Sequence, residues 1–263
     1  MRTASLPVLL LLASCASAPP RAATAPVTAP MATVAPPSAE LRAAIEAPDR
    51  SADDRALDAQ RHPAEMLSFF GIHRGQRVAD LFAGGGYTTE LLARAVGAEG
   101  RVFGENNRFI LERFAEGPWS ARLAKPELRN VVRVDRELDD PLPPEATDLD
   151  AVIFVLAYHD SVWLNTDRAA MNRAVFRALK PGGVYGIVDH AAAAGHGVAD
   201  AQTLHRIEAR VVIEEVQAAG FRLDGEAGFL RNAADTHDWN DSPRAAGERR
   251  GTSDRFVLRF VRP

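Results

Sequence analysis

Three consecutive glycines at the end of an apolar run form the first pattern with chemical meaning. The run Arg77–Ala83 predicts a strand and the residues from Tyr87 onward predict a helix, so the glycines form the turn between them. Such a turn lets a ligand approach the backbone and leaves unpaired N–H groups at the helix N-terminus. Glu105 ends a second short strand 25 positions after Asp80, near the roughly 20 positions typical of an acid that binds ribose hydroxyls. The predicted nucleoside-binding residues of this turn and strand are Gly84, Gly85, Gly86 and Glu105.

A second group of polar residues follows two later strands. The most apolar run of the domain, Leu149–Leu156, predicts a central strand buried on both faces, and Tyr158-His159-Asp160 follows it. Asp189-His190 closes the strand after that. A neutral imidazole beside a carboxylate can act as a general base near pH 7. His159, Asp160 and His190 are therefore candidate catalytic residues, and the alternative that the histidines only hydrogen-bond loop carbonyl groups stays open.

The elements around these residues alternate between strand and helix. This alternation predicts a doubly wound α/β domain with a mostly parallel sheet. The predicted strands cover residues 77–83, 102–105, 130–135, 149–156, 184–189 and 256–261, with another beginning at 221. The predicted helices cover residues 38–47, part of 49–60, a stretch starting at 63, 87–96, 109–125 with a break at Gly117-Pro118, 166–179 and 202–219.

These patterns together resemble the class I S-adenosylmethionine-dependent methyltransferases. The resemblance rests on the glycine turn, on Glu105 and on Leu179-Lys180-Pro181-Gly182-Gly183 before a strand. A narrower likeness to a group of bacterial predicted methyltransferases is carried by further segments. These are Gly84–Leu92, Tyr158-His159-Asp160, Asp189-His190, Leu204-His205-Arg206-Ile207 and Asp254-Arg255-Phe256-Val257-Leu258.

The resemblance implies a seven-stranded sheet with helices on both faces and S-adenosyl-L-methionine as cofactor. It implies that Asp80 organises the amino-acid end of the cofactor and that Asp135 contacts the adenine. A capping role for Asp80, a solvated strand end at Glu105 and a solvated turn at Asp135 remain the structural alternatives. In the strand order of that fold the strands before His159 and His190 are neighbours, so both histidines and Asp160 are expected to face one pocket.

The sequence departs from the superfamily pattern at two places. Phe82 stands where the first glycine of the turn is usual, although Gly84 and Gly86 are kept. No Asp-Pro-Pro-Tyr or Asn-Pro-Pro-Tyr follows the fourth strand, which argues against the enzymes of the family that methylate amino groups of nucleic acids.

The remaining histidines do not predict a metal site. His190, His196 and His205 have Asp189 and Asp200 among them, and zinc or another divalent ion could use such ligands. No His-x-x-x-His spacing occurs, so no metal is predicted. His205 and Arg206 are instead expected to cap or pair on the face of the helix at 202–219.

The first residues are typical of a signal and a tether. Residues 1–14 carry one arginine and an apolar core too short to span a membrane, which predicts a signal peptide. Leu12-Ala13-Ser14-Cys15 resembles a lipobox, so Cys15 is the predicted lipidation site, with an ordinary cleaved signal as the alternative. Residues 15–39, rich in proline and alanine, predict a tether, and residues 40–263 predict one domain.

Charge and leader together constrain the partners. The formal net charge is −4, and no basic stripe with aromatic residues occurs, so nucleic acid is not an expected partner. The function hypothesis is methyl transfer to a small-molecule acceptor by a lipoprotein on the periplasmic side of the bacterial envelope, anchored to the membrane surface. Translation from Met31 would give a cytoplasmic enzyme instead. The alternative function is an envelope lipoprotein that uses the fold as a non-catalytic nucleoside- or metal-binding module.

Overall fold

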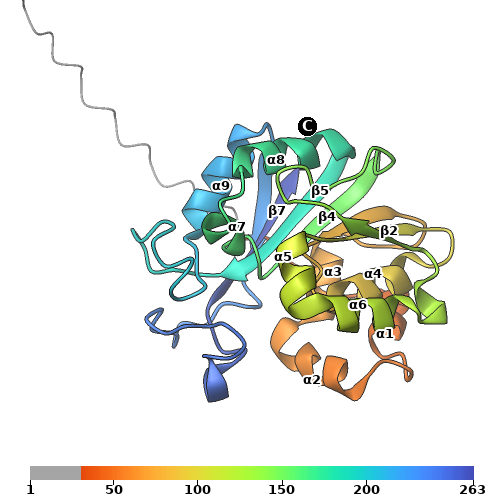
Figure 1. The fold of residues 1–263 in the computed structure, drawn as a ribbon, viewed down its shortest axis with the longest axis horizontal. Helices are drawn as coiled ribbons and strands as arrows, with labels where there is room; N and C mark the ends of the chain where they lie inside the picture. The colour runs from red at the N-terminus through yellow and green to blue at the C-terminus, as the bar shows by residue number, and fades with distance from the viewer. Residues whose placement is uncertain (1–30) are drawn as a thin grey trace, which may run out of the picture.

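A seven-stranded sheet forms the centre of the computed structural model, which describes residues 31–263. The strand order is β3-β2-β1-β4-β5-β7-β6, with β1 to β5 parallel and β7 antiparallel to both of its neighbours (Figure 1). This arrangement confirms the predicted doubly wound, mostly parallel sheet. The strands are β1 Arg77–Leu81, β2 Arg101–Asn106, β3 Val131–Asp135, β4 Leu149–Val155, β5 Leu179–His190, β6 Arg222–Ala227 and β7 Arg255–Val261.

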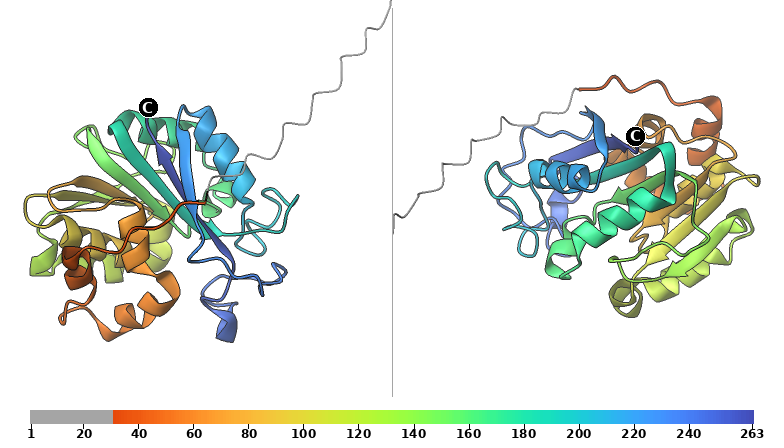
Figure 2. Two further views of the ribbon diagram at one scale, coloured as in Figure 1. Left: turned by 180° about the vertical axis from the view of Figure 1, so that it is seen from behind. Right: turned by 90° about the horizontal axis from the view of Figure 1, so that it is seen from above.

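Helices cover both faces of the sheet (Figures 1 and 2). One core layer lies between the sheet and α8 and α9, and the other lies under α1, α3 and α4, with α6 beside them. The helices are α1 Ala39–Ile45, α2 Ala52–Arg61, α3 Pro63–Phe69, α4 Tyr87–Val96, α5 Arg108–Ile110, the π-helical η1 Leu111–Ala115, α6 Glu116–Leu123, α7 Asp160–Trp163, α8 Arg168–Ala178 and α9 Ala209–Ala218. Two short 3₁₀ turns, η2 Pro126–Leu128 and η3 Gly247–Arg249, complete the described elements. Among residues 31–263, no helix is both long enough and apolar enough to cross a bilayer.

A buried ion network holds the leading helices against α4. The Glu90 carboxylate, on α4, pairs with Arg94 at 2.8 Å, with Arg122 at 2.5 Å and with Lys125 at 2.7 Å. Arg122 also pairs with Asp54 of α2 at 2.6 Å. Because Glu90 is almost fully buried, each of these cations is needed to offset the cost of desolvating its charge.

The residues just before α1 run along the domain in an extended path (Figure 2). The N–H of Ala32 donates to the carbonyl of Glu226 at 2.8 Å, and the Ser68 hydroxyl donates to the carbonyl of Ala35 at 2.7 Å. The packed chain therefore extends back to residue 31. The predicted signal at residues 1–14, Cys15 and the first part of the tether lie outside the described residues.

Three predicted element boundaries are wrong. Helical backbone is continuous from Arg108 to Leu123 and runs through Gly117-Pro118, which follow directly on the π-helical turn η1 with its shifted hydrogen-bond pattern. Strand β5 starts at Leu179 rather than 184, since Gly182 is tied to the last strand by its N–H to the carbonyl of Arg262. Residues 202–208 form loop and turn instead of the start of a helix.

The Trp119 indole fixes how closely α6 approaches β2. A Cβ atom added at Gly104 would lie 2.6 Å from Trp119 Cη2 and 2.8 Å from Cζ2, and Trp119 is fully buried. We expect Gly104→Ala to destabilise the fold by about 1–3 kcal/mol through overpacking, measured by chemical denaturation. In a Trp119→Phe background the same substitution should cost clearly less. An equal cost in both backgrounds would contradict this assignment.

Candidate cofactor and acceptor site

The glycine turn after β1 is held open by an asparagine of the neighbouring strand. The N–H of Gly84 donates to Asn106 Oδ1 at 2.7 Å, and Asn106 Nδ2 donates to the Gly84 carbonyl at 3.0 Å. Gly84 has a φ of 56°, and a Cβ atom there would meet no atom within 4 Å. At Gly84 the turn therefore presents bare backbone to open space, whereas Gly86 packs against Trp119. Sequence reasoning missed Asn106, whose position next to Glu105 at the strand end was the available signal.

Glu105 is buried with one carboxylate oxygen unused. The N–H of Phe82 donates to Oε2 at 2.9 Å, while Oε1 has no hydrogen-bond partner among the described residues. Burial raises the pKa of Glu105 well above its usual value, and the nearby carboxyl group of Asp80 adds to this. An unpartnered acceptor beside an open glycine turn fits a ligand that brings hydroxyl donors. The unpartnered Oε1 atom of Glu105 fits the predicted contact with ribose hydroxyl groups.

Asp80 lies beneath the turn, where it ties β1 to α4. The Thr89 hydroxyl donates to Asp80 Oδ2 at 2.5 Å. Burial raises the pKa of Asp80 to about 7, against the opposing effects of Thr89 and of the Arg61 charge. The structure thus places Asp80 next to the glycine turn, as a buried acid that accepts a hydrogen bond from Thr89 in the first turn of α4.

Asp135 is not brought into the buried part of this region. It pairs in register with Asn106 at the end of β3, but its side chain is 47% exposed and forms an ion pair with Arg133 at 2.8 Å. The predicted adenine contact stays a prediction, and the geometry favours the solvated-turn alternative.

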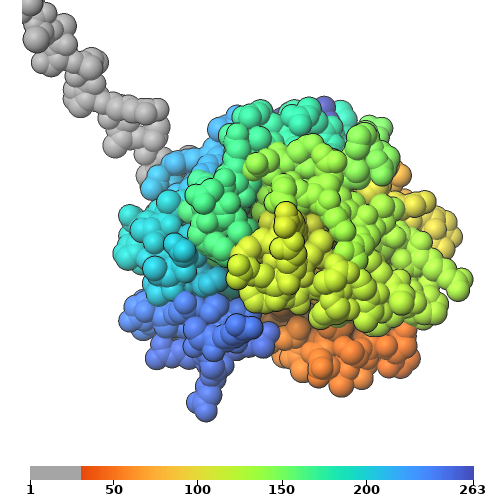
Figure 3. Space-filling view, viewed as in Figure 1, coloured from red at the N-terminus to blue at the C-terminus, as the bar shows by residue number. Residues whose placement is uncertain are grey.

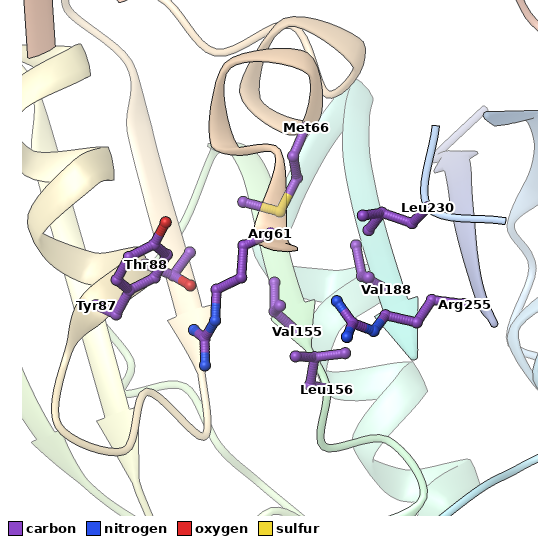
Figure 4. Close-up of a pocket in the computed structure, with 9 residues that line it drawn as sticks. All are labelled: Arg61, Met66, Tyr87, Thr88, Val155, Leu156, Val188, Leu230 and Arg255. Carbon is purple, nitrogen blue, oxygen red and sulfur yellow. The ribbon is translucent and has the colours of Figure 1, made fainter. Parts of the chain in front are cut away.

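A small cavity opens beside the glycine turn, and the side chains that bound it converge from α2, α3, α4, β4, β5, β7 and the loop after β6 (Figure 4). Two of its walls come from the ends of β4 and β5. The lining residues are Arg61, Met66, Tyr87, Thr88, Val155, Leu156, Val188, Leu230 and Arg255. Figure 3 shows that α2, in orange, and the segment around 232–251, in dark blue, flank this end of the molecule.

Two arginines face the cavity without a carboxylate partner. Arg61, at the end of α2, lies over the Tyr87 ring at 4.5 Å from its centroid, and Arg255 donates to the carbonyl of Gln60 at 2.7 Å. Neither forms a salt bridge with any residue in 31–263. Burial lowers the pKa of both guanidinium groups. The pair is therefore suited to an anionic group. Sequence reasoning missed the pair, because Arg61 lies in no motif and Arg255 was noted only as part of the segment Asp254–Leu258, without a role.

Asp189 organises the polar residues at the ends of β4 and β5. Its carboxylate is fully buried and accepts from the backbone N–H of His159 at 2.7 Å, from His159 Nδ1 at 2.7 Å and from the N–H of His190 at 2.8 Å. Because an ionised carboxylate only accepts hydrogen bonds, the proton between them lies on His159 Nδ1. The other ring nitrogen of His159, Nε2, therefore faces Asp160 and His205.

The three predicted catalytic residues are brought together, but with unequal properties. The His159 and His190 ring centroids are 5.8 Å apart, and His159 Nε2 lies 3.2 Å from Asp160 Oδ1. Burial opposes charge on His159, yet the Asp189 and Asp160 carboxylates outweigh it and raise the pKa of His159 to about 10. In this state His159 is an imidazolium at neutral pH and has no lone pair to accept a proton.

His190 has the opposite character. Burial lowers its pKa and outweighs the contact with Asp241. Its Nδ1 lies 2.8 Å from the Ser253 hydroxyl and also contacts the Asp241 carboxylate. This places the ring proton on Nδ1 and leaves a neutral imidazole with Nε2 as a lone-pair donor. Of the predicted residues, His190 has the arrangement that a general base needs.

His205, which the sequence places on a helix, instead turns toward His159. Its backbone is left-handed, with a φ of 56°, and its Nδ1 lies 3.1 Å from His159 Nε2. The helix expectation is wrong because Arg206 is fully buried in an ion pair with Asp235 at 2.7 Å and donates to the carbonyl of Ala191 at 3.0 Å. Those bonds hold the segment as a loop.

The fold is similar to those of solved methyltransferases. A SAM dependent methyltransferase from Aquifex aeolicus has a TM-score of 0.57 at 16% identity, covering 80% of this chain and 95% of that chain. This chain has the class I S-adenosylmethionine-dependent methyltransferase fold. A putative sarcosine dimethylglycine methyltransferase from Galdieria sulphuraria gives 0.56 at 18% identity, with 83% and 89% coverage. The arsenic(III) S-adenosylmethionine methyltransferase of Chlamydomonas reinhardtii gives 0.53 at 20% identity, with 86% and 73% coverage.

No protein-family model and no curated protein sequence matches the chain. The solved structures therefore establish the methyltransferase fold, and the chemistry must be argued from the residues. Those residues lie at the carboxyl ends of adjacent parallel strands, where open α/β sheets bind ligands.

The raised pKa of Asp80 predicts a pH-dependent stability difference. A buried carboxyl with a folded-state pKa of about 7 favours the fold while protonated, and that contribution is lost as the pH rises from about 4 through 7. We expect the stability of Asp80→Asn relative to wild type to increase across this range by on the order of 4 kcal/mol. Thermal unfolding at several pH values measures the difference. Thr89→Val should move the transition to higher pH, and a flat Asp80→Asn difference would be incompatible with a protonated Asp80.

Proposed function

We propose that the protein transfers a methyl group from S-adenosyl-L-methionine to a small-molecule acceptor. The observation that carries the proposal is the orphan oxygen of Glu105 beside the open turn at Gly84, within the methyltransferase fold. His190, the last residue of β5, is a neutral imidazole that can take a proton from an acceptor. This property supports catalysis rather than binding alone.

The cofactor would be held by three groups of this chain. The backbone of Gly84–Gly86 and the helix N-terminus behind it would take the centre of the molecule, and Glu105 would accept from its hydroxyls. Arg61, half-buried beside Tyr87 at the same turn, would pair with its carboxylate. When bound, S-adenosyl-L-methionine supplies the activated methyl group and its own leaving group.

The acceptor would lie toward β4 and β5. His190 Nε2 is the nitrogen that would take the acceptor proton, while Ser253 and Asp241 hold Nδ1. His159 and Asp160 would orient the acceptor, since the His159 imidazolium is a donor and Asp160 an acceptor. The net negative charge of the chain and its lack of a basic stripe support a small acceptor over nucleic acid.

A non-catalytic module remains the second candidate, and one observation favours it. The leader-like residues 1–14 and Cys15 would place the domain outside the compartment that makes the cofactor. We therefore propose that the protein is anchored to the envelope through Cys15, and intact-mass spectrometry of the native protein tests this anchoring. An acylated Cys15 would support the anchoring, and an unmodified chain starting at Met31 would contradict it.

The role of Arg61 gives a direct binding test. We expect the protein to bind S-adenosyl-L-methionine at least tenfold more tightly than its decarboxylated analogue, measured by isothermal titration, because only the former has a carboxylate for Arg61. Arg61→Met should reduce this preference to near unity and leave the affinity for the analogue almost unchanged. No binding of either compound at millimolar concentration would exclude the proposed function.

The role of His190 gives a test of turnover. His190→Ala should lower the release of S-adenosylhomocysteine in the presence of a panel of small hydroxyl and thiol acceptors by about 10²–10⁴-fold. Its affinity for S-adenosyl-L-methionine should stay within about twofold of wild type, because His190 lies on the acceptor side. Full turnover in this variant would remove His190 as the base, and equal loss of cofactor affinity would favour the non-catalytic module.

A further inference from the structure

Three side chains at the ends of β4 and β5 bring their ligand atoms to one point. His159 Nε2 lies 3.1 Å from His205 Nδ1 and 3.2 Å from Asp160 Oδ1, and His205 Nδ1 lies 3.5 Å from Asp160 Oδ1. We call His159, Asp160 and His205 the three-residue cluster. Two imidazole nitrogens and one carboxylate oxygen form a donor set that binds divalent transition metals. His159 carries a proton on Nε2 in the metal-free protein, and a bound metal ion would displace that proton into solvent.

The separations match the dimensions of a coordination polyhedron. A tetrahedral ion with bonds of about 2.0 Å to nitrogen and oxygen requires its ligand atoms to lie roughly 3.3 Å apart. The three observed separations fall around that value. An ion could therefore occupy the centre of this face with little movement of the three side chains.

The surrounding residues orient these ligands as they do in known metal sites. Asp189 fixes the tautomer of His159 through Nδ1 and so directs Nε2 toward the cluster. The Trp163 indole donates to Asp160 Oδ1 at 2.8 Å. His205 is held in its left-handed conformation, a costly one for a residue with a side chain, by the buried Arg206 that follows it.

The cluster is reachable from solvent on one side. The His205 side chain is 25% exposed, Asp160 is 15% exposed and His159 only 3%. Three protein ligands with one open side are typical of sites in which a metal keeps a position for water or substrate.

We propose that His159, Asp160 and His205 bind a divalent transition-metal ion of the zinc class, with Asp189 as the residue that positions His159. The site lies on the acceptor side of the fold, so an oxygen or sulfur atom of the acceptor is the natural fourth ligand. Metal binding itself does not depend on the proposed methyl transfer.

Zinc titration of the full chain tests the ligand set. After treatment with a chelator, the protein should bind one Zn²⁺ per chain with a dissociation constant on the order of 1 µM or below, measured by competition with a chromophoric chelator. His205→Asn should weaken binding by more than about 100-fold, and asparagine tolerates the left-handed backbone that this position requires. The matched control is His196→Asn, which alters an exposed His–Asp pair with a 2.7 Å contact to Asp200.

The outcomes are decisive in both directions. Stoichiometric binding that is lost in His205→Asn and kept in His196→Asn supports the site. Absence of stoichiometric binding, or equal affinities of wild type and His205→Asn, overturns it. Circular dichroism of the metal-free variants establishes that each is folded, and Asp160→Asn provides a second ligand variant that must also lose affinity.

Asp189→Asn tests the positioning role separately. Asparagine has one acceptor oxygen, whereas this site presents N–H donors from His159 backbone, His159 ring and His190 backbone. We expect a loss of about 10–100-fold in Zn²⁺ affinity and a changed visible spectrum when the variant is saturated with Co²⁺. A purely structural effect would weaken binding but leave the saturated Co²⁺ spectrum as in wild type, and this result would remove Asp189 from the proposal.

The two proposals fail in distinguishable ways. Loss of Zn²⁺ binding in His205→Asn with intact S-adenosyl-L-methionine affinity is the expected pattern. Zinc binding by a protein that never binds S-adenosyl-L-methionine would support the metal site while excluding methyl transfer. Cofactor binding and turnover by a chelator-treated protein that takes up no Zn²⁺ would support methyl transfer and exclude the metal site.

Discussion

The proposed acceptor side of this molecule depends on one buried carboxylate. Asp189 has no exposed surface, and its cost of burial is offset by three hydrogen bonds from His159 and His190. Two of these donors are backbone N–H groups, so the loop after β4 is tied to the end of β5 at a fixed distance. The orientation of the His159 ring follows from this arrangement. A hydrogen-bonded carboxylate thus determines which nitrogen atoms the surface presents.

The proposed cofactor side depends on a second network that reaches much further along the chain. Arg122 contacts Asp54 and Glu90 and donates to the carbonyl of Gly85 at 2.5 Å. The same guanidinium therefore joins α2, α4 and the glycine turn. Because α2 carries Arg61 at its end, the ion network that stabilises the leading helices also sets the position of that arginine over the turn.

Local patterns were enough to predict the sheet and the two clusters of polar residues at the carboxyl ends of its strands. Leu149–Leu156 could only be a buried central strand, and the pairing of β4 with β5 brings His159 and His190 together as expected. His205 could not be placed, because its turn depends on the ion pair of Arg206 with Asp235, 29 positions away. Arg61 and Arg255 meet across still longer separations, and neither belongs to a periodic pattern. Sequence reasoning fails where a buried long-range ion pair overrides local propensity.

The charged residues at the carboxyl ends of the strands are complementary to a particular kind of ligand. Asp80 and Glu105 are buried without an ion-paired cation among the described residues, and the Asp80 carboxyl group raises the cost of ionising Glu105. A positively charged group beside them would relieve that cost. Arg61 and Arg255 face the adjoining cavity, where a negatively charged group would offset the cost of burying their guanidinium groups. A ligand that carries cationic groups and a carboxylate in one molecule satisfies both, and S-adenosyl-L-methionine, with its sulfonium, ammonium and carboxylate, has that distribution of charge. The electrostatics therefore support the same ligand as the geometry of the turn, from residues that do not belong to the glycine motif.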